Sequence, residues 1–121
     1  MNYETTARIE SSAAPGVSFV VRRMSFARRT ELIRRIRDLA QRIEVANAGE
    51  SPRDKLDAAL LSSEIERTYV LWGLEAVSGL VLDGAPATPE SLLASGPEEL
   101  FREALAAIKS ECGLTGDERK N

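Results

Sequence analysis

Arginine is the residue type whose clustering most strongly suggests chemistry in this chain. Eight arginines lie between positions 22 and 42 against two acidic residues, so this stretch carries a net charge of +6 and the rest of the chain carries −9. Clustered arginines are typical of nucleic-acid-binding surfaces, because each guanidinium can bind a phosphate. The candidates for contact with a partner in this stretch are Arg28, Arg29, Arg34, Arg35, Arg37 and Arg42.

The same arginines also suit a helix face that is solvated or turned toward a protein, paired with the acidic helix that follows. The sequence pI of about 5.1 favours this alternative. No aromatic residues interleave with the arginines to stack on bases. Glu31 with Arg35 and Asp38 with Arg42 are spaced four residues apart, where opposite charges simply support a helix. We therefore favour a protein over a nucleic acid as the partner.

The residue types that usually carry catalysis are scarce. The chain has no histidine, which is the commonest general base and metal ligand, and it has one cysteine, Cys112. We expect Cys112 to be a small core residue near a helix end. The spacings of an HExxH site, an EF-hand, a GxGxxG turn and a P-loop do not occur. The sequence predicts no enzyme, no cofactor and no metal. Structural roles are expected for the carboxylates weighed as acid–base pairs, which are Glu64, Glu66, Glu75, Glu98, Glu99 and Glu103.

Two aromatic residues near the end of a predicted helix have two interpretations. Tyr69 and Trp72 suit the core of the domain, which is the favoured role. They also suit an anchor for a protein partner, since Tyr and Trp are enriched at interface hot spots. We keep both residues as candidate partner-binding residues, together with Arg28, Arg29, Arg34, Arg35 and Arg42.

Length and composition indicate one globular domain. The chain has 121 residues, with 43% hydrophobic and 29% charged residues, an ordinary globular balance. No apolar run approaches the roughly 18 residues of a membrane span. Residues 1–10 lack the apolar region of a secretory signal. We expect a cytoplasmic protein with a single domain over 1–121 that contacts no membrane.

The first half of the chain predicts a β-hairpin and then a helical hairpin. Strands are expected at 5–11 and 17–23, joined by a turn at Pro15 and Gly16 within the segment 1–24. Ser25 should cap a helix that ends near position 48. The apolar stripe of this helix has the helical spacing, with Leu32, Ile36, Leu39, Ile43 and Ala46.

A second helix is predicted from Pro52 to about Trp72, capped by Ser51, which completes a helical hairpin over 25–72. The short connection makes the two helices antiparallel. The apolar stripe of the second helix is formed by Leu61, Ile65, Thr68 and Trp72, and it is widened by Leu56 and Leu60.

The region 77–113 predicts strand, turn and helix in succession. A strand is expected at 77–82, and Asp83-Gly84 is a strong two-residue turn signal. A short return at 85–87 follows, then a helix from Pro89 to about position 94 and a last helix from 97 to about 112. Residues 114–121 form a polar tail. The predicted fold class is α+β and predominantly helical, with the order β-β-α-α-β-β-α-α, a long antiparallel helical hairpin and a small antiparallel sheet.

Several segments together resemble one family along nearly the whole chain. The segments are 15–19, 24–29, 31–36, 79–93, 96–100 and the helix over 104–113. Their succession of strand, Asp-Gly turn, Pro-Ala-Thr and short helix is similar to that of the small tail assembly chaperones of tailed phages and prophages.

This resemblance implies a non-enzymatic protein in the cytoplasm of the bacterial host. Such chaperones coat the tape-measure protein, which is elongated, helical and prone to aggregate, and they bring tail-tube subunits to it. They are absent from the finished particle, and many are made in a short form and a longer frameshifted form. The family has no fixed binding motif, so the resemblance assigns no residue a role.

Two other classes remain open. The protein can be a structural subunit of the tail or of the head–tail connector that stays in the particle. It can also be a small nucleic-acid-binding regulator that uses the arginine-rich helix over 28–42. The sequence leaves the oligomeric state open, a homo-oligomer included.

Overall fold

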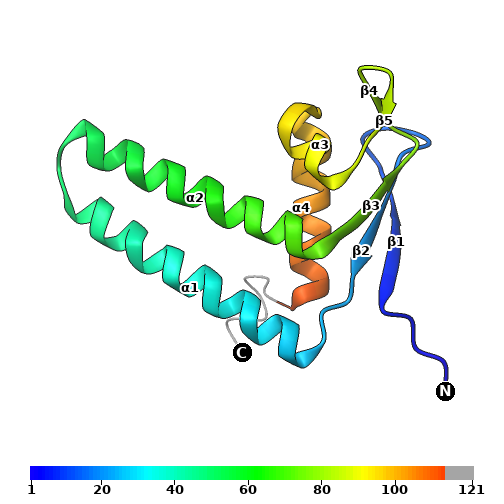
Figure 1. The fold of residues 1–121 in the computed structure, drawn as a ribbon, viewed down its shortest axis with the longest axis horizontal. Coiled ribbons are helices and arrows are strands. Elements are labelled where there is room, and N and C mark those ends of the chain that lie inside the picture. Colours follow the sequence, from blue (N-terminus) through cyan, green and yellow to red (C-terminus); the bar gives the residue numbers. More distant parts are fainter. Residues whose placement is uncertain (114–121) are drawn as a thin grey trace.

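The computed structural model describes residues 1–113, so the predicted polar tail at 114–121 lies outside the described residues. It confirms the predicted fold class, α+β and predominantly helical, with a long helical hairpin and small antiparallel sheets. The hairpin extends to one side of a body formed by the sheet and the C-terminal helices (Figure 1). No described helix is both long enough and apolar enough to span a membrane.

The sheet has three strands in the order β1-β2-β3. Strands β1 (Thr6–Glu10) and β2 (Ser18–Arg22) form the predicted N-terminal hairpin. Strand β3 (Leu74–Ser78) pairs antiparallel with the other edge of β2, with a register shift between Val20 and Val21. The central strand β2 is therefore paired on both sides, which gives the marginal two-stranded hairpin the partner strand it requires.

The two helices of the hairpin begin where their capping residues predict. Helix α1 spans Phe26–Ala48, and the Ser25 hydroxyl accepts a hydrogen bond from the Arg28 backbone N–H at 3.2 Å. Helix α2 spans Pro52–Gly73, and Ser51 accepts from the Asp54 backbone N–H at 3.1 Å. These bonds satisfy first-turn donors that have no partner inside the helix.

The predicted strand at 77–82 is wrong in its bounds. Helix α2 runs directly into β3, and Gly79 then interrupts the extended chain with a φ of +81°. Only β4 (Val81–Leu82) and β5 (Ala85–Pro86) follow, as a separate two-stranded ribbon. The apolar pattern does not reveal the break, because Gly79 is read as part of a strand unless its left-handed backbone is known. The predicted turn at Asp83-Gly84 is confirmed by positive φ angles of 50° and 82°.

Helices α3 (Pro89–Ser95) and α4 (Glu98–Cys112) complete the body. Thr88 and Ser91 cap α3 reciprocally, because each side-chain oxygen accepts a hydrogen bond from the backbone N–H of the other residue. Gly113, with a φ of 69°, ends α4 in the left-handed conformation. Helix α4 packs against α2 and β2.

The core lies where the sheet, α4 and the sheet-proximal parts of α1 and α2 meet. Its members come from these elements and from α3, so the core holds the body together. The largest fully buried apolar side chains are Phe19, Val21, Leu32, Val70, Leu92, Ile108 and Cys112.

The far half of the helical hairpin has no comparable core. We call residues 37–64 the distal arm, which comprises the second half of α1, the connection and the first half of α2. Ala58 is its single buried residue. The stripe residues Leu39, Ile43 and Leu61 are only partly buried there. The predicted stripes face one another, but two helices alone cannot enclose them.

Candidate protein-binding surface

Two of the candidate arginines are held against Trp72. The Arg28 guanidinium lies 4.3 Å from the centroid of the indole ring, and that of Arg35 lies 5.0 Å from it. Arg28 also donates a hydrogen bond to the Trp72 backbone carbonyl at 3.1 Å. Burial, and secondarily the charge of Arg22, lowers the pKa of Arg28. These contacts fix α1 to the end of α2 and leave Trp72 covered by guanidinium groups.

Tyr69 is part of the core, with 7% of its surface exposed, as its favoured interpretation predicted. The Lys109 ammonium lies 5.2 Å from its ring centroid, so α4 covers this side chain. Trp72 packs against the core as well, from a partly buried position. Both aromatic residues therefore serve the packing of the body in this structure, and neither lines the grooves described below.

The other candidate arginines are spread over different faces. Arg34 pairs with Glu31 at 2.5 Å, and Arg35 reaches the same carboxylate at 3.4 Å. Arg29 is exposed on α1, and Arg42 lies in the distal arm. The structure therefore brings Arg28, Arg35 and Trp72 together but does not bring all the candidate residues to one site.

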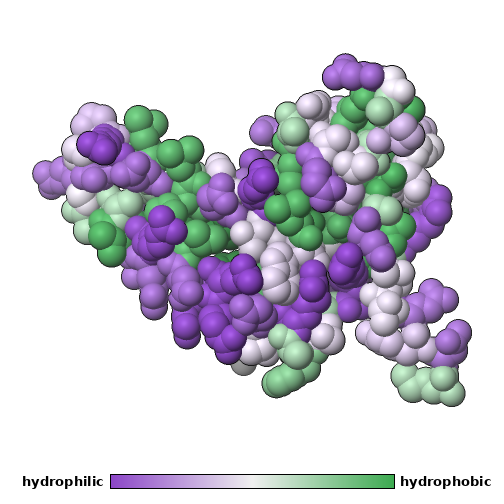
Figure 2. All heavy atoms as spheres, viewed as in Figure 1, coloured by the Kyte–Doolittle hydropathy of each residue, from purple (hydrophilic) through white to green (hydrophobic). Residues whose placement is uncertain are grey.

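One surface feature is a groove between the two helices of the distal arm, which we call the arm groove. It encloses about 790 Å³. Its apolar lining consists of Val45, Ala46, Leu60 and Leu61. Val45 is 77% exposed and Leu60 is 66% exposed. Figure 2 shows apolar side chains gathered on the arm, facing a hollow that separates the arm from the body.

The charged residues around the arm groove are mainly acidic. They are Asp54, Asp57 and Glu64, against the one cation Arg42. Asp54 accepts a hydrogen bond from the Ser51 hydroxyl at 2.8 Å. Among residues 1–113, no ion pair within 4 Å involves Asp57, Glu64 or Arg42. The groove therefore offers apolar area together with a net negative charge, and its carboxylates Asp57 and Glu64 are in no ion pair among the described residues.

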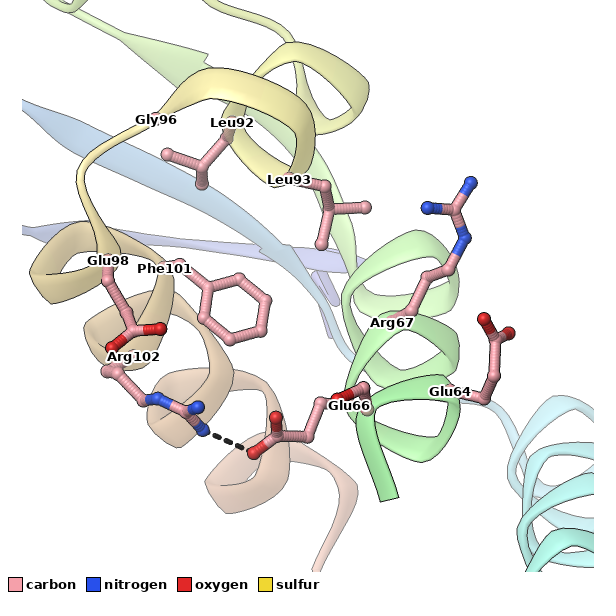
Figure 3. Close-up of a pocket in the computed structure, with 10 residues that line it drawn as sticks. Glu64, Glu66, Arg67, Leu92, Leu93, Gly96, Glu98, Phe101 and Arg102 are labelled. Carbon is pink, nitrogen blue, oxygen red and sulfur yellow. Dashed lines mark hydrogen bonds and ion pairs between the residues drawn. The ribbon is translucent and has the colours of Figure 1, made fainter. Parts of the chain in front are cut away.

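A second groove, the body groove, lies between α2 and the helices α3 and α4 and encloses about 330 Å³ (Figure 3). Leu92, Leu93 and Phe101 supply its apolar lining. Leu93 and Phe101 are partly buried against the core, so they are held in place while part of each side chain stays accessible. An ion pair between Arg102 of α4 and Glu66 of α2 links its two walls.

The two grooves meet, because Ser63 and Glu64 of α2 line both of them. The two apolar linings therefore adjoin along one side of α2 with these two polar residues between them. Sequence reasoning placed Leu60 in the apolar stripe of the second helix but did not single out either groove. The available signal was Leu56 and Leu60, which widened the stripe of α2 beyond what one neighbouring helix can cover.

The single cysteine does not line either groove. Cys112 is buried at the end of α4, and burial raises the pKa of its thiol to about 11. Within residues 1–113, no group of three or more His, Cys, Asp or Glu side chains is placed to hold a metal ion. What the described surface supplies is apolar area bordered by charge, which is the chemistry of protein binding.

Comparison with known proteins adds no family to this description. The chain matches no protein-family model, no curated protein and no solved structure.

Proposed function

We propose that this protein is a non-enzymatic assembly factor of a tailed phage or prophage, a tail assembly chaperone that acts in the cytoplasm of the bacterial host. In this proposal it binds the elongated helical tape-measure protein and recruits tail-tube subunits to it. The resemblance of the chain to small tail assembly chaperones suggests this partner. The structure contributes a surface with the chemistry that such a partner requires.

The observation that carries the proposal is the body groove. An amphipathic helix binds by laying apolar residues at helical spacing into an apolar groove. Leu93 and Phe101 present accessible apolar area from a rigid base, because both pack against the core. A pre-ordered base lowers the entropic cost of binding. This suits a chaperone that shields apolar helices from aggregation.

The border of the body groove can orient the bound helix. Arg67 and Glu64 lie on the α2 side, and Glu98 lies at the start of α4 (Figure 3). Charges of both signs around an apolar centre favour one register over others and raise the association rate. The Glu66–Arg102 ion pair bridges α2 and α4 at the edge of this groove.

Co-expression tests the proposal directly. The tape-measure protein of the same tail gene cluster is produced with a tagged form of this chain, and the fraction of it that stays soluble and co-purifies is measured. Leu93→Arg together with Arg67→Glu should abolish co-purification, because the substitutions put charge on the apolar wall and reverse the border. Val81→Arg is the matched control, since Val81 is 64% exposed on the separate β4–β5 ribbon.

Other results would replace the proposal. A folded Leu93→Arg/Arg67→Glu variant that retains the tape-measure protein as well as the control would rule out the body groove as the site. Persistence of the protein in purified particles by mass spectrometry would identify a structural tail or connector subunit. A salt-sensitive gel shift lost in Arg29→Ala/Arg34→Ala would identify a nucleic-acid-binding regulator instead.

A further inference from the structure

The first turns of α1 present an exposed surface that neither the core nor the proposed function uses. Phe26 is 80% exposed and Ile33 is 42% exposed. They are seven residues apart on one helix, so they lie on the same face. Arg29 and Arg37 lie close to this line at helical spacing, and both side chains are exposed. We call these four residues the α1 outer face.

This face is strongly basic. Residues 26–37 contain five arginines and one acidic residue. Arg37 approaches Asp38 at 3.7 Å, but both side chains are about two-thirds exposed. Such an exposed pair is weak, so it leaves most of the positive potential of the helix in place. The α1 outer face thus combines two exposed apolar side chains with cationic neighbours.

The arm groove has the complementary character. Its exposed apolar residues Val45 and Leu60 can receive apolar side chains. Asp57 and Glu64 lie beside them without ion pairs among the described residues. The basic α1 outer face and the acidic arm groove therefore occur on one chain. They lie at opposite halves of the helical hairpin (Figure 1).

We propose that the arm groove of one copy binds the α1 outer face of a second copy, so that the chains associate head to tail. The contact is heterologous, because each copy contributes a different surface. A groove-to-groove contact about a two-fold axis would instead bring two acidic surfaces together. Like charges facing one another cost free energy and disfavour that arrangement.

In an open row of copies joined head to tail, the copy at one end has an unused arm groove and the copy at the other end has an unused α1 outer face. The assembly therefore grows with protein concentration unless its geometry closes a ring. The body groove shares only Ser63 and Glu64 with the arm groove, and its apolar lining is formed by other residues. The association itself requires no other protein, so its test is independent of the proposed function.

The test uses two variants, each of which disables one of the two surfaces. Leu60→Lys places a cation in the arm groove and leaves the outer face intact. Ile33→Lys removes apolar area from the outer face and leaves the arm groove intact. Both positions are exposed, so the fold should survive, and circular dichroism checks this. Val81→Lys serves as the exposed control.

Sedimentation velocity then measures the mass of each sample over a range of protein concentrations. The wild type and the control should grow in mass with concentration, and each variant alone should remain a monomer. An equimolar mixture of the two variants should give a species of twice the monomer mass and no larger. This follows because one variant supplies the intact face and the other the intact groove.

Three outcomes would overturn the inference. The first is a wild-type chain that stays monomeric at all concentrations. The second is an Ile33→Lys variant that associates like the wild type while Leu60→Lys does not, since this identifies a two-fold groove contact. The third is a mixture of the two variants that remains monomeric.

Discussion

The two helices of the hairpin run from the body into the distal arm, and their apolar side chains are covered to different extents in these two regions. Near the sheet, α1 contributes Leu32 and α2 contributes Tyr69 and Val70 to a core closed by β2 and α4. In the arm, Leu39 and Ile43 continue the stripe of α1 but stay only partly buried. Among residues 1–113, no third element covers the two helices of the arm as α4 and β2 cover them in the body.

This difference assigns the two regions different tasks. Buried apolar area is the main source of folding free energy, so the body should carry most of the stability. The arm keeps apolar side chains accessible, which lowers what it contributes to folding and makes it available for association. Arg28 and Trp72 lie in the body half of the hairpin, and their contacts connect α1 to the end of α2.

The largest expected effect is on the free energy of unfolding, and it is seen by comparing one isoleucine of the body with one of the arm. Ile108 is fully buried in α4, so Ile108→Ala should lower the free energy of unfolding by about 2–5 kcal/mol. Ile43 in the arm is only partly buried, and Ile43→Ala should cost about 1 kcal/mol or less. Urea unfolding followed by circular dichroism measures both. Equal losses would show that the arm is packed as tightly as the body.

The next prediction compares two glycines that share a positive φ. A Cβ at Gly79 would overlap the Gly16 carbonyl oxygen, whereas a Cβ at Gly84 would meet no atom within 4 Å. Gly79→Ala should therefore cost about 2–4 kcal/mol, from backbone strain and the clash, and Gly84→Ala about 1–2 kcal/mol from strain alone. Thermal unfolding of the two variants gives the difference. Similar losses would contradict the close approach of the β3 end to the first turn.

A smaller effect is expected where α1 contacts the end of α2. Arg28→Ala removes both the contact with the Trp72 ring and the hydrogen bond to its carbonyl, and should cost about 1–2 kcal/mol. Arg35→Ala should cost about 0.5 kcal/mol, because Arg35 is more exposed. Indole fluorescence should also change more for Arg28→Ala. A larger loss at Arg35 would show that the ion pair with Glu31 dominates this contact.

The smallest effect concerns the pH dependence of the body. The Ser11 hydroxyl, with the Ser12 groups, donates hydrogen bonds to Glu103 and lowers the pKa of this carboxyl below its usual 4.5. A lowered pKa in the folded state contributes stability above pH 4.5, and this contribution is lost as the pH falls through the folded value. We expect about 1 kcal/mol or less, since Glu103 is partly exposed.

Glu103→Gln isolates this contribution. The difference in unfolding free energy between the wild type and Glu103→Gln should be constant near neutral pH and shrink below pH 4.5. Denaturant titrations at a series of pH values measure it. A difference that persists in acid would mean that the contact is steric and does not depend on the charge.

Local signals predicted the elements well because each acts within a few residues. Ser25 and Ser51 cap helices as their types indicated, and Asp83-Gly84 forms the expected turn. The prediction of a strand at 77–82 was wrong in its bounds, because these depend on the pairing of β3 with β2 and on the left-handed backbone of Gly79. That pairing joins residues far apart in the sequence, so no local pattern specifies it.

The candidate surface was harder to predict than the fold. The sequence singled out the arginines and Trp72, and the structure uses Arg28 and Arg35 to cover that indole. Residues that line the two grooves, such as Leu60 and Phe101, were not among the predicted partner-binding residues. Helical spacing shows which side chains share a face, but it does not show whether another element covers that face.

The sequence by itself determined the α+β class, the helical hairpin and the separation of charge between a basic first helix and an acidic remainder. Helix caps, turn residues and apolar spacing act locally, so they can be read from neighbouring positions. The tertiary structure alone decided where the apolar stripe of the hairpin is buried and where it stays open. Helix α4 and strand β2 pack against only one end of it, and that packing depends on contacts between distant parts of the chain.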